Sequence, residues 1–247
     1  MTWFEEVFNE DYDRIYMHTF TEARNRAEAE FIEAALNVPP GSELLDLACG
    51  HGRHALILAQ RRFKVTGLDL SERFVKMAQE EAKRRQLDAR FDVGDMRKLP
   101  YKNKFDGVYS YFTSFGYFSH RENVKVLEGV ARALHKGGKF LLDTANREWL
   151  LHQVEAQPRR WDELDHDYVY LDDVSFNART SRVHGRRIVL DAGQRRELVF
   201  DLRVYSLAEL EELIESADMK IVSTYGDRDR SPFSISSRRM VIVSERS

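Results

Sequence analysis

The chain has 247 residues, of which 43% are hydrophobic and 11% aromatic, enough to bury one substantial core. Its 38 Lys and Arg residues against 41 Asp and Glu give a net charge of -3, which excludes a general electrostatic attraction to nucleic acid. The single cysteine, Cys49, excludes an internal disulfide and a multi-cysteine zinc site and is typical of a reducing compartment.

The sequence predicts neither export nor insertion into a membrane. Residues 1–16, MTWFEEVFNEDYDRIY, are acidic and aromatic and lack the basic and apolar regions of a signal peptide. No apolar run approaches the roughly 20 residues that a membrane span requires. We therefore expect a soluble, cytoplasmic protein.

Helical and extended patterns alternate along the first part of the chain. The helical stripe of 21–37 stops at Pro39-Pro40, and the glycines 137–138 mark the turn out of the last helix of this part. Strand and helix units in series favour an α/β, doubly wound, Rossmann-like fold with a mostly parallel sheet. We expect helices over 21–37, 53–61, 71–86 and 121–134, and strands over 43–47, 64–70, 89–95, 105–111 and 139–145.

The pattern changes after residue 147. Residues 148–205 contain alternating strands with turns predicted near His184-Gly185 and Ala192-Gly193, which indicates an antiparallel β insertion. The earlier pattern returns with a helix over 206–217 and strands near 219–225 and 237–244, which completes a seven-stranded sheet. The predicted domains are therefore 1–147 with 206–247, and the insertion at 148–205.

A glycine-rich bend follows the first strand. Asp46 lies near the end of that strand, and Gly50 and Gly52 occupy the bend before a helix. Glycine lets the backbone approach a ligand closely, and the helix N-terminus offers unpaired N–H groups. The bend alone is equally typical of an ordinary tight turn.

Acidic residues end the next two strands. Asp69 follows Gly52 by 17 residues, where a carboxylate can accept hydrogen bonds from both ribose hydroxyls of a nucleoside. Asp95 ends the third strand, where it can accept from an adenine amino group while Met96 packs on the ring. Helix capping through Ser71 and a turn before Leu99 are the structural alternatives.

Together these motifs resemble the class I S-adenosylmethionine-dependent methyltransferases. The resemblance rests on D-x-x-C-G-x-G at 46–52, the acidic residue at 69, G-D-M at 94–96, F-D-G-V-Y-S-Y at 105–111 and the glycine-rich approach to the strand at 139–145. It covers roughly residues 10–147 and resumes at 206. Ala48-Cys49 departs from the Gly-x of many members, but a small residue is kept, and Cys49 is read as a packing residue.

The resemblance implies S-adenosyl-L-methionine as cofactor. Gly50 and Gly52 would lie along its methionine part, Asp69 at the ribose, and backbone groups of Ser110 and Tyr111 near the ammonium. The tyrosines of an N-terminal lid helix would bind the carboxylate, although core packing explains them equally well. The predicted cofactor-binding residues are Tyr12, Tyr16, Arg24, Asp46, Ala48, Cys49, Gly50, Gly52, Asp69, Leu70, Asp95, Met96, Ser110 and Tyr111.

The run YSYFTSFGYF at 109–118 is rich in aromatic residues and leaves a central strand, at the edge where open parallel sheets bind ligands. We predict Phe112, Phe115 and Tyr117 as the substrate wall, whereas Tyr109 and Phe118 suit the core. Aromatic faces also favour a sulfonium cation.

Methyl transfer from a sulfonium needs no acid for the leaving group, because a neutral thioether departs. An amine or hydroxyl acceptor must lose a proton, and we predict His120 first and Tyr111 next as its acceptor, with Tyr117 and His152 as alternatives. His120 can equally be a surface residue that begins a helix. Only Asp143 and Asn146 follow the later strands as oxygen ligands, so no metal is expected.

The acceptor itself is predicted to be a small molecule methylated on nitrogen or oxygen. The insertion is acidic first and basic later, which is typical of solvated strand faces but also of a cap over the pocket or a homodimer interface. Its arginines would favour an anionic acceptor. RNA or protein methylation, a nicotinamide-dependent oxidoreductase and a non-catalytic cofactor-binding module are the alternatives; position 55 is Ala, which disfavours the oxidoreductase.

Overall fold

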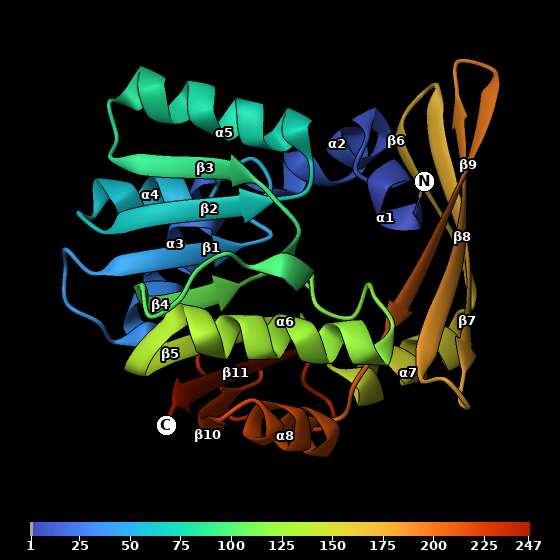
Figure 1. The fold of residues 1–247 in the computed structure, drawn as a ribbon. Helices are drawn as coiled ribbons and strands as arrows, with labels where there is room; N and C mark the ends of the chain where they lie inside the picture. The colour runs from blue at the N-terminus through green and yellow to red at the C-terminus, as the bar shows by residue number, and fades with distance from the viewer. Residues whose placement is uncertain (1) are drawn as a thin grey trace.

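A computed structural model describes residues 2–247. Its larger sheet has seven strands in the order β10-β11-β5-β4-β1-β2-β3, in which only β11 runs antiparallel to its neighbours (Figure 1). The predicted mostly parallel, seven-stranded Rossmann-like sheet is therefore confirmed. The strands are β1 Glu43–Leu47, β2 Lys64–Asp69, β3 Ala89–Val93, β4 Phe105–Ser110, β5 Leu134–Ala145, β10 Met219–Tyr225 and β11 Arg239–Arg246.

Helices cover both faces of this sheet, because its buried strands are apolar on both sides. Leu44 packs into a core with α3, α4 and α5, whereas its neighbour Leu45 points to the opposite core beneath α6 and α8. Serine and threonine N-caps such as Ser71 and Ser119 begin several of the helices. The helices are α1 Trp3–Glu6, α2 Glu10–Tyr16, α3 Glu22–Leu36, α4 Ala55–Gln60, α5 Glu72–Arg85, α6 His120–Ala133, α7 Arg147–Ala156 and α8 Leu207–Ser216, with 3-10 turns η1 Met17–Thr19 and η2 Met96–Lys98.

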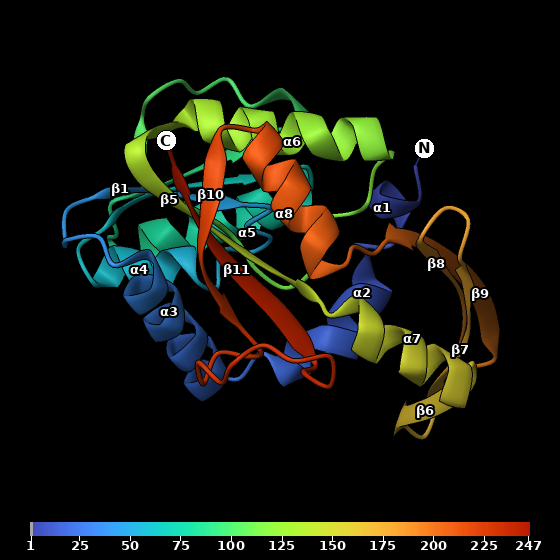
Figure 2. The same ribbon diagram turned by 90° about the horizontal axis from the view of Figure 1, so that it is seen from below.

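A second, antiparallel sheet has the order β6-β7-β8-β9. It stands opposite the carboxyl ends of the parallel strands, with α1 and α2 between the two sheets (Figures 1 and 2). The antiparallel part of the insertion is confirmed, and the homodimer expected through it stays a prediction. Its strands are β6 Arg159–Asp165, β7 Tyr168–Asn177, β8 Arg182–Asp191 and β9 Gln194–Arg203.

Two glycine positions differ from the sequence expectation. His184-Gly185 lies inside β8 rather than in a turn, and the chain instead reverses before Arg182, where Ser181 has a φ of 53°. Gly137-Gly138 lies in a bulge within β5, because the register of β4 and β5 jumps between Phe105 and Gly107. The turn at Ala192-Gly193 is confirmed.

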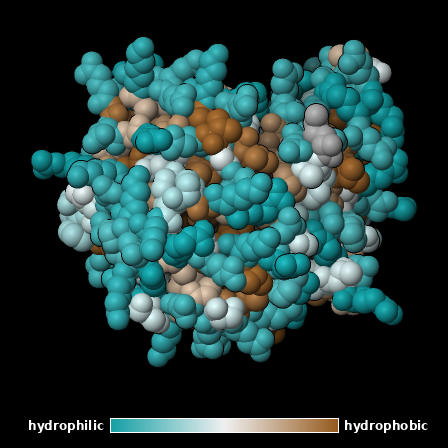
Figure 3. Space-filling model, viewed as in Figure 1, coloured by the Kyte–Doolittle hydropathy of each residue, from teal (hydrophilic) through white to brown (hydrophobic). Residues whose placement is uncertain are grey.

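The surface and the helices agree with the composition. Seen from the side of Figure 1, the molecule is mostly hydrophilic, and hydrophobic residues gather where α1 lies beside the larger sheet (Figure 3). Within residues 2–247, no helix has both the length and the apolar character needed to cross a membrane.

Gly185 is needed for side-chain space rather than for a turn. It pairs with Phe200 across β8 and β9, and a Cβ at this position would lie 1.8 Å from Cζ of the Phe200 ring. Covering a strand glycine with a neighbouring aromatic ring is a known way to complete such a sheet.

We predict that Gly185→Ala lowers the free energy of unfolding by about 1–3 kcal/mol, because the new methyl group must displace the Phe200 ring. Urea denaturation measures the change. Val199→Ala is the matched control on β9, since Val199 is 55% exposed and its truncation should cost no more than about 0.5 kcal/mol. Equal stability of Gly185→Ala and the parent chain would contradict this packing role.

Candidate active site

A cavity of about 1510 Å³ lies where the two sheets face each other. Its walls are the carboxyl ends of the parallel strands, the helices α1 and α2, and residues of β8 and β9. A single small ligand usually occupies about 300–1,000 Å³. The cavity therefore has room for more than one ligand.

The glycine-rich bend and Asp69 form one corner of this cavity. Gly50 has a φ of 54° and donates its N–H to Asp69 Oδ2 at 2.8 Å, while the N–H of Ser71 donates to Oδ1 at 2.9 Å. Gly52 lies outside the lining, and its role is packing, because a Cβ there would be 3.0 Å from both Ala78 and Phe91. The bend thus fixes the Asp69 carboxylate at the cavity wall.

Two residues of the lining have buried polar atoms without a partner. Asp46 Oδ2 and Arg53 Nη2 make no hydrogen bond within residues 2–247. Burial raises the pKa of Asp46 to about 7. An orphaned acceptor and an orphaned donor beside one cavity fit the ammonium and the carboxylate of an amino acid.

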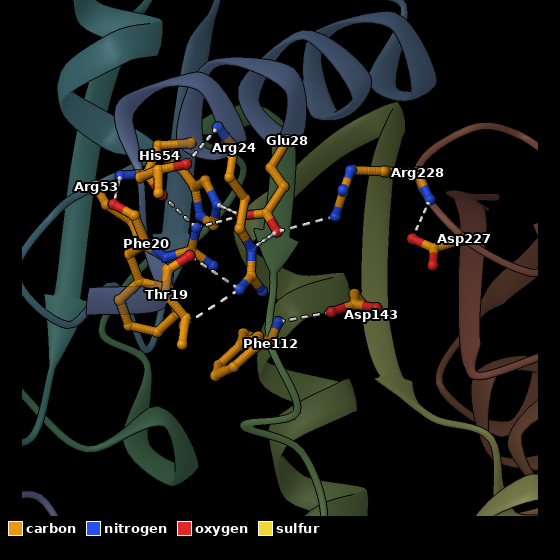
Figure 4. Close-up of polar contacts among 12 residues, drawn as sticks. Thr19, Phe20, Arg24, Glu28, Arg53, His54, Phe112, Asp143, Asp227 and Arg228 are labelled. Carbon is orange, nitrogen blue, oxygen red and sulfur yellow. Dashed lines mark hydrogen bonds and ion pairs between the residues drawn. The ribbon is translucent and has the colours of Figure 1, made fainter. Parts of the chain in front are cut away.

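Glu28 holds Arg53 in place (Figure 4). Its buried carboxylate accepts hydrogen bonds from Arg53 and from Arg24 Nε at 2.9 Å, and lies 3.0 Å from His54 Nε2. Arg228, from the segment after β10, lies 3.7 Å away. Burial opposes ionisation of Glu28, but the hydrogen bond with His54 and the charge of Arg53 outweigh it and lower the pKa.

Two aromatic rings pack close to the guanidinium of Arg53. Its guanidinium lies 4.4 Å from the ring centroid of Phe20 and 5.5 Å from that of Phe112. Phe112 has a φ of 75°, and its N–H donates to Asp143 Oδ2 at 2.7 Å. Arg239 pairs with the same carboxylate at 2.5 Å. The loop after β4 is thereby anchored against β5 and β11.

At the end of β3, Asp95 lines the cavity and Met96 is buried beneath it. The Asp95 carboxylate accepts from Arg97 Nη2 at 2.7 Å, and Arg97 also pairs with Glu122 at 2.8 Å. Although burial opposes it, hydrogen bonding from Arg97 lowers the pKa of Asp95. Asp95 is therefore an ionised acceptor at this wall.

The helices α1 and α2 and the bend between them contribute an aromatic stripe, in which Phe4, Phe8, Tyr12 and Tyr16 recur every four residues and all line the cavity. Ring centroids are 5.0 Å apart for Phe8 and Tyr12 and 4.8 Å apart for Tyr12 and Tyr16. Sequence reasoning found the tyrosines but missed Phe4 and Phe8. Their four-residue spacing is typical of one helical face, but the structure divides it between two helices and the bend at Phe8.

The structure brings most of the predicted site residues to one cavity. Arg24, Gly52, Ser110, Phe115 and His120 lie outside its lining. Phe118 is buried in the core, as expected, and also lines the cavity. The lining includes the other predicted residues, namely Tyr12, Tyr16, Asp46, Ala48, Cys49, Gly50, Asp69, Leu70, Asp95, Met96, Tyr111, Phe112 and Tyr117.

The expectation for His120 needs correction. His120 is an exposed first residue of α6, and its Nδ1 lies 3.4 Å from the hydroxyl of Tyr205. Phe115 is buried against the same tyrosine, with ring centroids 5.6 Å apart. Neither residue lines the cavity, and both contact Tyr205, which precedes α8.

The tyrosines are poor proton acceptors, because burial raises the pKa of both Tyr111 and Tyr117 and keeps the phenols protonated. His51 was not predicted, yet it lines the cavity and makes no hydrogen bond within residues 2–247. Burial and the charge of Arg53 lower the pKa of His51 to about 4, so its imidazole is neutral at pH 7.

The arginines of the second sheet do not form an anion site. The basic later part of the insertion has six arginines between residues 179 and 196. Five of them are paired with carboxylates, namely Arg182 with Asp201, Arg186 and Arg195 with Glu197, Arg187 with Asp172, and Arg196 with Asp11 and Asp191. The sequence-based expectation of an anionic acceptor rested on these arginines, and their pairing removes its main support.

Comparisons with known proteins agree with the geometry. A methyltransferase-domain family model matches residues 44–138. YqeM of Bacillus subtilis (strain 168), which carries the name of a methyltransferase, is 26% identical over 88% of this chain and 89% of YqeM. A dTDP-3-amino-3,4,6-trideoxy-alpha-D-glucopyranose N,N-dimethyltransferase of Streptomyces venezuelae is 34% identical over 42% of this chain and 43% of that enzyme.

Among solved structures, an S-adenosylmethionine-dependent methyltransferase from Clostridium acetobutylicum ATCC 824 superimposes with a TM-score of 0.81 at 19% identity. The match covers 98% of this chain and 99% of that one. The likeness shows that the fold, including the second sheet, recurs in that protein.

We predict that Glu28→Gln lowers the free energy of unfolding at pH 7 by about 3–5 kcal/mol, because it leaves the buried cation Arg53 uncompensated. The pKa of Glu28 is depressed from its ordinary 4.5 in the folded state, so this stabilisation is present above pH 4.5 and is lost as the pH falls. The difference between variant and parent should therefore shrink in acid.

Chemical denaturation at pH 7 and pH 4 measures both values. Glu30→Gln is the control on the same helix, since Glu30 forms an exposed pair with Arg61 that is worth no more than about 1 kcal/mol. A pH-independent difference for Glu28→Gln would contradict an ionised, structural Glu28.

Proposed function

We propose that this chain is a class I S-adenosylmethionine-dependent methyltransferase, as the methyltransferase-domain model over residues 44–138 and the similarity to YqeM support. We propose further that it methylates a nitrogen or oxygen atom of a small molecule held in the cavity between its two sheets. The observation that carries this proposal is the position of the second sheet. It walls the cavity opposite the strand ends, so an acceptor must fit inside rather than lie across an open face.

The residues of the parallel sheet fit the cofactor. Asp69 would accept from the ribose hydroxyls, and Asp95 would face the adenine. At the other end, the orphaned atoms of Asp46 and Arg53 would pair with the ammonium and the carboxylate. Bound there, S-adenosylmethionine supplies an electrophilic methyl group on a sulfonium.

The remaining lining would hold and orient the acceptor. The aromatic stripe of α1 and α2 lies on one side, and the β9 side chains Leu198, Phe200 and Leu202 lie on another. Such walls exclude water and fix the approach of a nucleophile, which can supply much of the rate acceleration of a displacement. The sugar amine methylated by the Streptomyces relative supports a small acceptor with a nucleophilic nitrogen or oxygen.

His51 is the residue that suits removal of the acceptor's proton. Its imidazole is neutral at pH 7 and lines the cavity without a hydrogen-bond partner, whereas the neighbouring His54 is bonded to Glu28. A neutral imidazole that lines the acceptor's cavity would take the proton of an acceptor bonded to it, and the lowered pKa of His51 makes it a weaker base than an ordinary histidine.

Turnover tests the whole proposal. The purified chain, S-adenosylmethionine and a small-molecule cell extract should yield S-adenosylhomocysteine, with a new product 14 mass units heavier than its parent for each methyl group transferred. Extracted RNA and protein serve as the alternative acceptors. Product formation on those fractions alone would refute the small-molecule proposal.

We predict that Asp69→Asn weakens the binding of S-adenosylhomocysteine at least about tenfold, because the amide replaces one of the two acceptor oxygens and the charge. Isothermal titration calorimetry measures the affinity. Asp92→Asn is the control at the neighbouring strand, since Asp92 lies outside the cavity and pairs with Arg90. Unchanged affinity in Asp69→Asn would contradict the cofactor placement.

We also predict that His51→Gln lowers kcat by about 10²-fold or more, the usual contribution of a general base, while the affinity for S-adenosylhomocysteine changes less than about threefold. The acceptor found by turnover is the substrate for this measurement. His135→Gln, an exposed residue of β5, is the control. A parental kcat in His51→Gln would refute its role.

A further inference from the structure

A buried ion pair on the inner face of the second sheet holds a tyrosine of α2. Arg187 on β8 lies directly across from Asp172 on β7, and its Nε and Nη2 donate to the two carboxylate oxygens at 2.7 and 2.8 Å. The side chain of Asp172 is fully buried. Both terminal nitrogens of Arg187 also lie 3.2 Å from the hydroxyl oxygen of Tyr16.

This arrangement leaves Tyr16 with one hydrogen to donate. A phenol has two lone pairs and one O–H, and the two N–H groups of Arg187 occupy the oxygen. No acceptor for the O–H of Tyr16 exists among residues 2–247. Since Tyr16 and Arg187 both line the cavity, that hydrogen is available to a ligand.

The charge around this hydroxyl decides which ligand atom it suits. The guanidinium polarises the phenol and makes it a stronger donor. At the same time Asp172 neutralises Arg187 within the buried pair, while the second cation at Asp172, Arg160 at 3.5 Å, is 60% exposed and screened by solvent. The buried pair therefore has no net charge to attract a carboxylate or a phosphate. A neutral oxygen with a free lone pair, such as a carbonyl, fits best.

The neighbouring side chains indicate the shape of the ligand. The ring of Tyr12 lies 4.8 Å from that of Tyr16 and 5.9 Å from that of Phe74. The aliphatic Leu198 and the ring of Phe200 line the cavity from β9. Flat, apolar surfaces of this kind favour a planar, conjugated molecule over a polyhydroxylated one.

We propose that Tyr16, oriented by Arg187 and Asp172, binds the carbonyl oxygen of a planar, conjugated methyl acceptor. That this ligand is the methyl acceptor rests on the proposed function, whereas its binding to Tyr16 does not require methyl transfer. It moves Tyr16 from the expected cofactor carboxylate to the acceptor, because its hydroxyl contacts the second sheet rather than Arg53.

A matched pair of probes tests the carbonyl preference. The full chain, saturated with S-adenosylhomocysteine, is titrated with 2-acetylnaphthalene and with 2-ethylnaphthalene, which differ chiefly in the carbonyl oxygen. The carbonyl probe should bind about tenfold more tightly, as expected for one hydrogen bond in a site shielded from water. Equal affinities in the parent chain would overturn the proposal.

Tyr16→Phe should abolish that preference while leaving the affinity for S-adenosylhomocysteine within about twofold. Tyr101→Phe is the control, since this phenol bonds to Asp92 and lies outside the cavity, and it should keep the tenfold preference. A preference that survives in Tyr16→Phe would overturn the assignment.

The variant Asp172→Asn tests the role of Asp172 independently of Tyr16→Phe. With the Arg187 charge no longer neutralised, the affinity for 2-naphthoate should rise relative to that for 2-acetylnaphthalene, and an unchanged ratio would contradict the role of Asp172. Loss of S-adenosylhomocysteine binding in the parent chain would refute the proposed function. Normal cofactor binding without a carbonyl preference would refute only this inference.

Discussion

Asp11 and Asp13, two carboxylates of the short helix α2, fasten the two sheets to each other across the cavity. Asp13 pairs with Arg73 at the start of α5 at 2.5 Å, while the buried Asp11 pairs with Arg196 of β9 at 2.7 Å and accepts from the Tyr168 hydroxyl at 3.0 Å. A seven-residue helix is too short to be stable alone. Its position, and with it this wall of the cavity, depends on these contacts with both sheets.

Buried polar atoms are informative here because most of them are satisfied. Glu28 and Asp172 each sit among cations that compensate their burial, and removal of either partner would leave an uncompensated charge. Among those of residues 2–247 with an unpartnered buried side-chain atom, Asp46 and Arg53 are the two that line the cavity, and the donor hydrogen of Tyr16 also lacks a partner in this part of the chain. Their positions around one cavity suggest that ligands, rather than the protein, complete them.

Local sequence patterns predicted the parallel sheet well, since apolar runs followed by glycine turns and capped helices form α/β units wherever they occur. They predicted turns wrongly where a glycine is required by a contact with a residue distant in the sequence. Gly185 resembles a turn residue in sequence, yet it lies in mid-strand because Phe200, 15 residues later, covers it. Gly137-Gly138 likewise lies in a bulge that only the pairing of β4 with β5 requires.

The sequence by itself determined the part of the cavity that we propose for the cofactor, because parallel strands must end at one edge of their sheet. Asp46, Asp69 and Asp95 therefore meet whatever the rest of the chain does. Only the tertiary structure decided the acceptor half. The placement of Arg187 opposite Tyr16, 171 residues apart, and the removal of His120 from the cavity depend on how two sheets pack, and no local periodicity encodes that packing.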